Sequence, residues 1–147
     1  MDLNKFTQKS QEAVAQAQQV AIRLGHQQVD VDHLFSALIG QEDGLVPRLL
    51  ERAGYDVRAV SQALDTELGR LPRVSGPGAQ PGQIYVTQRM NEVMLAALDL
   101  SKQMQDEYVS VEHVLLAILD KPGTGPTSAV LRQFALTRDK VLSVLAE

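Results

Sequence analysis

Residues 29–39 read Val-Asp-Val-Asp-His-Leu-Phe-Ser-Ala-Leu-Ile, and residues 109–119 read Val-Ser-Val-Glu-His-Val-Leu-Leu-Ala-Ile-Leu. The two stretches share a valine pair, an acid, a histidine and an apolar run, at an offset of 80 residues (113 − 33). Further identities follow upstream at this offset, and downstream after one inserted residue: Thr7/Thr87, Gln8/Gln88, Glu12/Glu92, Ala17/Ala97, Leu50/Leu131, Val60/Val141 and Leu64/Leu145. Self-similarity of this extent indicates a tandem duplication.

The first copy predicts four helices. Thr7 precedes apolar residues spaced by three and four, which is typical of an N-cap that opens an amphipathic helix, and Gly25 is a natural end for it. Asp30 is the expected cap of a second, short and mostly buried helix. Pro47 fits the first turn of a third helix, and Asp56 is expected to cap a fourth.

The second copy repeats this plan after a segment that is rich in proline and glycine. We expect Thr87 to cap a helix that runs to about Gln105, Ser110 to cap the next one, and two shorter helices around Val130 and Val141. A short extended link is expected before Asp30, and the only stretch that could be a strand is expected at residues 84–86. The predicted fold is all-α, with one domain over residues 1–147 that consists of repeat one (6–68), a Pro/Gly linker (69–83) and repeat two (84–147).

Composition narrows the classes of function. The formal net charge is −4, with dispersed Lys and Arg, so nucleic acid is not an expected partner. There is no cysteine, which leaves no disulfide frame and no thiol nucleophile. No apolar stretch approaches the roughly 18 residues of a membrane helix, and residues 1–5 lack a signal-peptide pattern. A globular, cytoplasmic protein without a membrane partner is expected.

Repeat two is more apolar than repeat one at equivalent positions: Leu95 replaces Ala15, Leu98 replaces Gln18 and Leu116 replaces Ser36. Two interpretations of this surplus remain open. The extra side chains fill a seam between the repeats, or they form an exposed groove that binds apolar peptide.

His33 and His113 raise the question of metal or acid–base chemistry. Each lies in the first turn of its helix beside carboxylates only, with no second histidine at metal-ligand spacing, so a neutral hydrogen-bonding role is expected. The sequence also lacks phosphate-binding and nucleophile motifs. We therefore expect no catalytic residue, metal or cofactor in this chain.

Several segments together resemble the duplicated amino-terminal domain of Clp ATPases, most closely that of the ClpB-type disaggregases. They are residues 6–9 (Phe-Thr-Gln-Lys) with the Ala- and Gln-rich helix after them, the pair 31–34 and 111–114, and residues 71–74 (Leu-Pro-Arg-Val). The resemblance covers essentially the whole chain. It implies two pseudo-symmetric four-helix repeats ahead of ATPase modules, which would carry the ATP and magnesium that this chain lacks.

The resemblance also implies site residues. Family positions that affect substrate handling correspond to Thr7, Asp106 and Glu112. The family's apolar groove corresponds to Ala96, Leu100 and His113. ClpC-type relatives use the acid before the histidine to hold a phosphorylated arginine, which corresponds to Asp32 and Glu112; no basic residue adjoins either in the sequence.

The function implied first is the capture of exposed apolar segments of misfolded or aggregated polypeptides for threading by the attached motor. The alternative is a docking domain for adaptor proteins. A small metal-dependent enzyme, the third class, rests only on the histidines. By the same resemblance, the isolated domain is expected to be monomeric, the parent protein a hexameric ring, and adaptors or Hsp70-type co-chaperones partners of that parent.

Overall fold

The computed structural model describes residues 3–73 and 84–146, so part of the predicted linker lies outside the described residues. Within these ranges the chain is all-α, as predicted, with eight helices and two strands of two residues each. The helices are α1 (Gln8–Arg23), α2 (Val31–Ile39), α3 (Leu45–Arg52), α4 (Val57–Gly69), α5 (Gln88–Gln103), α6 (Val111–Asp120), α7 (Pro126–Phe134) and α8 (Arg138–Leu145). The strands are β1 (Gln28–Val29) and β2 (Tyr85–Val86).

The predicted N-caps are confirmed. The Thr7 hydroxyl accepts the amide of Ser10 at 3.2 Å, and Thr87 accepts that of Met90 at 3.1 Å. Asp30, Asp56 and Ser110 also cap the helices predicted for them. These caps satisfy amides that have no partner inside the helix, so local sequence fixes where each helix begins.

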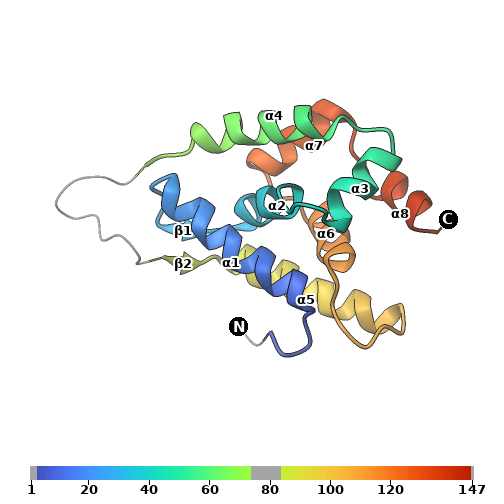
Figure 1. Cartoon of the computed structure of the whole chain (residues 1–147). Helices are drawn as coiled ribbons and strands as arrows, with labels where there is room; N and C mark the ends of the chain where they lie inside the picture. The colour runs from blue at the N-terminus through green and yellow to red at the C-terminus, as the bar shows by residue number, and fades with distance from the viewer. Residues whose placement is uncertain (1–2, 74–83, 147) are drawn as a thin grey trace.

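Helices α2 and α6 form the centre of the molecule (Figure 1). Helix α1 packs on α2 and α5 on α6, while α4 lies beside α7 of the other repeat. The central helices bury nearly their whole surface, including Phe35 and Leu38 of α2 and Leu115 and Ile118 of α6. They are buried all round because neighbours from both repeats cover them.

Extended segments of the two repeats pair with each other. β2, which precedes the first helix of repeat two, pairs in parallel with β1, which precedes the second helix of repeat one. In the reciprocal pairing, Phe6 forms a parallel bridge with Val109, and the amide of Thr7 donates to the Val109 carbonyl at 3.0 Å. The sequence predicted the extended stretch at 84–86 but not its partner, which lies in a segment expected to be only a link.

The apolar surplus of repeat two is divided among different environments. Leu116 is completely buried and Leu98 is half-buried, whereas Leu95 keeps 62% of its surface exposed. The interpretation of a seam alone therefore does not account for Leu95. None of the helices in the described parts of the chain is both long and apolar enough to cross a membrane.

Candidate functional site

Helix α5 carries an apolar row on its outer side. Ala96 and Leu100 are half-buried against the core, and Met104, the C-cap residue, is 46% exposed. These residues follow one another at intervals of four, which places them on one face of the helix. Leu95 and Tyr108 add exposed apolar surface on the same helix and on the loop after it. We call Ala96, Leu100 and Met104 the α5 row.

His113 does not belong to this open surface, because its side chain has no exposed area. The Ser110 amide donates to its Nδ1 at 2.9 Å, so the ring proton is on Nε2, which donates to the carboxylate of Asp106 at 2.7 Å. The predicted structural role of this histidine is thus confirmed. Its relation to the predicted binding surface is indirect: it holds Asp106, whose side chain is 49% exposed.

Thr7 and Glu112, the remaining predicted site residues, lie on either side of one junction between the repeats. Thr7 caps α1 and is bound through its backbone to Val109, three residues before Glu112. Glu112 is half-buried in the first turn of α6 and makes no side-chain hydrogen bond or ion pair within residues 3–73 and 84–146. Neither side chain forms a hydrogen bond or ion pair with a residue of the α5 row in the described parts of the chain.

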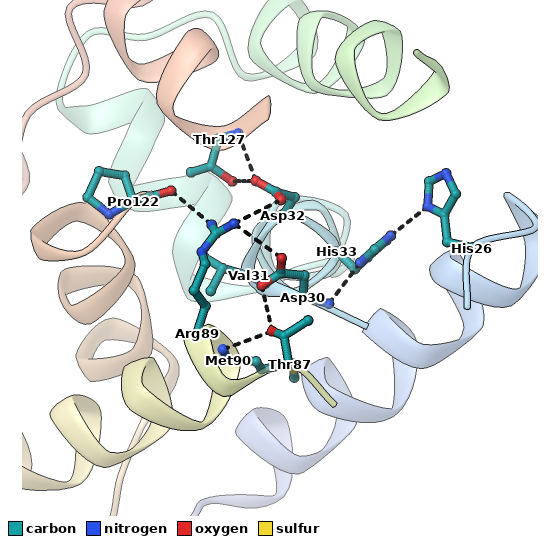
Figure 2. A network of polar contacts seen from close by, with 10 residues as sticks. All are labelled: His26, Asp30, Val31, Asp32, His33, Thr87, Arg89, Met90, Pro122 and Thr127. Atoms are coloured by element: carbon teal, nitrogen blue, oxygen red, sulfur yellow. Dashed lines mark hydrogen bonds and ion pairs between the residues drawn. The ribbon is translucent and has the colours of Figure 1, made fainter. Parts of the chain in front are cut away.

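The opposite junction holds a polar network from three segments (Figure 2). The Thr87 hydroxyl donates to Asp30 at 2.7 Å, and the Arg89 guanidinium donates to Asp30 at 3.2 Å and to the Pro122 carbonyl at 3.2 Å. The charged groups are partly shielded from water, which strengthens their attraction. This network ties α2 of repeat one to α5 of repeat two and to the loop before α7.

Asp32 lies deeper in the same junction, with only 3% of its surface exposed. Its Oδ1 accepts hydrogen bonds from the Thr127 amide (2.9 Å) and hydroxyl (2.6 Å), and Arg89 lies 4.0 Å from its Oδ2. Asp32 therefore anchors the start of α7. Sequence reasoning missed its basic neighbour, because Arg89 follows 57 residues later (89 − 32).

A pair of histidines borders this network in Figure 2. The Asp30 amide donates to Nδ1 of His33 at 2.9 Å, so the proton of His33 is on Nε2, which lies 2.8 Å from Nδ1 of His26. Burial lowers the pKa of His26, and Arg73 lowers it further. Burial likewise lowers the pKa of His33, with His26 adding to the effect.

His33 and His113 are poorly suited to bind metal. Both ring nitrogens of His33 and of His113 are already engaged in hydrogen bonds. Among the described residues, no three His, Cys, Asp or Glu side chains gather closely enough to hold an ion. The geometry favours the neutral, structural role expected for both.

Two of the hollows on the surface are lined by described residues. One, of about 430 Å³, lies at the polar junction and is lined by His26, Asp30, Asp32, Leu71, Arg89 and Pro126 among others. The second, of about 300 Å³, is lined by Val20, Arg23, Leu24, Ser36 and Asp65. We call the second hollow the repeat-one cleft. Sequence reasoning named neither, although the replacement of Leu116 by Ser36 was a signal for the second.

Comparison with known proteins gives a consistent result. Residues 5–134 match the model of the Clp repeat (R) N-terminal domain family. The chain is 52% identical over 147 residues to the chaperone protein ClpB of Nitratidesulfovibrio vulgaris, covering all of this chain but only 17% of that protein. The chain is 38% identical over 147 residues to a ClpB of Clostridium perfringens, again covering all of this chain and 17% of that protein.

Solved structures agree on the fold. The Hsp104 N-terminal domain from Candida albicans matches with a TM-score of 0.82 and 21% identity, covering 98% of this chain and 91% of that one. A ClpV N-domain in complex with a VipB peptide matches with a TM-score of 0.73 and 19% identity, covering 98% and 93%. Family match, whole-chain identity and the duplicated four-helix fold coincide, and the chain belongs to the Clp repeat N-terminal domains, with ClpB chaperones among its relatives.

Proposed function

We propose that this chain is the substrate-binding domain of an ATP-dependent disaggregase, and that it captures exposed apolar segments of misfolded or aggregated polypeptides. The observation that carries the proposal is the α5 row, where Met104 is 46% exposed next to the half-buried Ala96 and Leu100, on a helix whose buried face packs on α6. Apolar side chains in a row on one helix face suit an extended or helical apolar segment. Asp106, in the loop that follows this helix, adds an exposed carboxylate beside the row.

The parent protein is part of this proposal, because the chain spans only 17% of the length of its ClpB relatives. We propose attached ATPase modules that use ATP and magnesium, a hexameric ring formed by those modules, and a cytoplasmic location. The isolated domain is then monomeric and performs no catalysis itself. Hsp70-type co-chaperones or adaptors would act through the parent protein.

The test is an NMR titration of the labelled domain with a permanently unfolded client, reduced and carboxymethylated α-lactalbumin. We expect weak binding, on the order of micromolar or poorer, because an unfolded segment must be ordered against a small apolar area. Amide shifts should cluster on residues 93–104 and at the start of α6.

Ala96→Glu should reduce these shifts without unfolding the domain, since a carboxylate in the row is costly to desolvate when a client binds. The matched control is Gln16→Glu, at the equivalent and exposed position of repeat one (96 − 80). Unchanged client affinity in Ala96→Glu, or shifts that avoid α5, would refute the α5 row as the client surface.

Adaptor docking is the second candidate, and two observations favour it. A similar N-domain, that of ClpV, was solved with a VipB peptide, and acidic side chains (Asp106, Glu107 and Glu112) are exposed or half-buried around the start of α6. A folded adaptor recognised through these acids should bind more weakly as ionic strength rises, whereas binding to the α5 row should be nearly insensitive to salt. A salt titration of the bound complex distinguishes the two.

A further inference from the structure

The repeat-one cleft occupies the place in repeat one that the α5 row occupies in repeat two. Its residues Val20 and Leu24 correspond to Leu100 and Met104 at the offset of 80 (20 + 80 and 24 + 80). The equivalence extends to the helices, because these residues lie in the last turn and at the C-cap of α1 and α5, and α1 packs on α2 as α5 packs on α6. The two repeats thus present equivalent faces, and the face of repeat one contains a hollow.

One difference between the repeats stands out at this hollow. Ser36 lines it, whereas the equivalent residue of repeat two is the larger Leu116, whose side chain is completely buried. Helix α4 supplies a further wall through Asp65, which follows Leu64.

We infer that the repeat-one cleft takes up one uncharged side chain of about leucine size from an unfolded client. Repeat two indicates the size of this side chain, because Leu116, the residue equivalent to Ser36, buries its whole side chain. The walls formed by Val20 and Leu24 are apolar, and Arg23 and Asp65 add one charge of each sign, so the cleft favours neither an anion nor a cation.

This inference rests on the proposed function, because it gives the same client a second point of attachment. An extended segment that reached both the cleft and the α5 row would bind more tightly than either contact alone, since the second contact forms at high effective concentration. Each contact remains weak by itself, which permits release to an attached motor.

The experiment compares two substitutions at one position. Ser36→Leu places in the cleft the side chain that repeat two already has, whereas Ser36→Ala leaves the cleft open. The labelled full domain is titrated with N-acetyl-leucine amide, with N-acetyl-serine amide as a polar control, and with carboxymethylated α-lactalbumin. We expect the leucine probe and the client to shift the amides around Val20, Leu24 and Ser36 in the wild type and in Ser36→Ala, and these shifts to vanish in Ser36→Leu.

Thermal melting of the variants makes the test independent of binding. Ser36→Leu should raise the midpoint, because the leucine fills a hollow that the protein leaves open, while Ser36→Ala should change it little. A lowered midpoint in Ser36→Leu would mean that the side chain does not fit, and the inference would be overturned.

The outcomes separate this inference from the proposed function. Client shifts on α5 that persist in Ser36→Leu, with no probe shifts at the cleft in the wild type, would overturn the inference and leave the α5 row in place. The absence of client shifts on both surfaces would refute the proposed function itself. Cleft shifts that grow with protein concentration in the absence of probe would identify a second copy of the chain as the occupant and would also overturn the inference.

Discussion

His26 and Asp106 occupy equivalent positions (106 − 26 = 80), and each contacts the histidine in the first turn of its repeat's second helix. In repeat two the histidine Nε2–H meets a carboxylate. In repeat one the Nε2–H of His33 donates to Nδ1 of His26. The proton of His26 then lies on its Nε2, which is buried and has no hydrogen-bond partner in the described structure. The same helix start is therefore held by a charged acceptor in one repeat and a neutral one in the other.

When the His26–His33 pair gains a proton, at least one of the hydrogen bonds made by the two rings must break. A proton on Nδ1 of His33 would face the Asp30 amide, and a proton on Nδ1 of His26 would face the Nε2–H of His33. Asp30 and Asp32 favour the charged form of His33, but burial and the neighbouring His26 outweigh them, and its pKa is lowered. Arg73 acts in the same direction on the pKa of His26.

We predict that acid destabilises the domain through this pair. Because the folded-state pKa values lie below the ordinary 6.5, the unfolded chain binds more protons, so stability is complete above pH 6.5 and decreases as pH falls through the lowered pKa values. Thermal midpoints measured from pH 7.5 to about 5, above the range where ordinary carboxyl groups titrate, should show this loss. His26→Asp, which copies repeat two, should lose less over the same interval, and parallel losses would contradict the assignment.

We predict that replacing the two threonine caps with alanine lowers the free energy of unfolding by different amounts. Thr7 satisfies a first-turn amide, so Thr7→Ala should cost about 1 kcal/mol. Thr87 does the same, and its hydroxyl donates to the Asp30 carboxylate at 2.7 Å, whereas the Thr7 hydroxyl donates to the neutral Ser10 hydroxyl at 3.0 Å. Because a hydrogen bond to a carboxylate is the stronger one, Thr87→Ala should cost about 2 kcal/mol. Urea unfolding of both variants measures the difference. If Thr7→Ala left stability unchanged but weakened client binding, Thr7 would be a contact residue instead of a cap.

Between helices, the acids that precede the two histidines differ in role. Asp32 is buried and anchors the start of α7 through Thr127, whereas Glu112 is half-buried without such a partner in the described residues. We predict that Asp32→Ala costs on the order of 3 kcal/mol, because two donors and the nearby Arg89 lose a buried carboxylate.

Glu112→Ala is the matched control and should cost less than about 1 kcal/mol, since it removes only a favourable charge at a helix N-terminus. Chemical denaturation of the two variants gives both values. Equal costs would show that the hydrogen bonds of Asp32 to α7 contribute little to the stability of the junction.

Sequence patterns predicted the helices well because caps and apolar spacing are local signals. Thr7, Asp30 and Asp56 each begin the helix expected of them, and both histidines have the hydrogen-bonding role expected of them. The contacts between the repeats were not predicted, because they depend on which segments meet in space. The partner of β2 and the approach of Arg89 to Asp32 both belong to that class.

Across the whole molecule, each repeat completes the other. The strand pairs cross between repeats in both directions, α4 lies beside α7, and α3 contacts α6 and α8. The central helices α2 and α6 are buried from both sides and would expose apolar surface if separated. The duplication therefore produces one cooperative unit with two related but unequal faces, and the α5 row and the repeat-one cleft lie on those faces.

This interleaving predicts that a single repeat does not fold alone. A fragment of residues 84–147 would lose the strand partners β1 and Phe6 and the α2, α3 and α4 neighbours of α6 and α7. A chain of that size buries too little apolar surface to offset its conformational entropy without them. Circular dichroism of this fragment should show little helix and no cooperative melt, and an equimolar fragment of residues 1–83 should restore both. The intact domain should unfold in one calorimetric transition, whereas a cooperative melt of the isolated fragment would show that the repeats are separate folding units and that the junctions only join them.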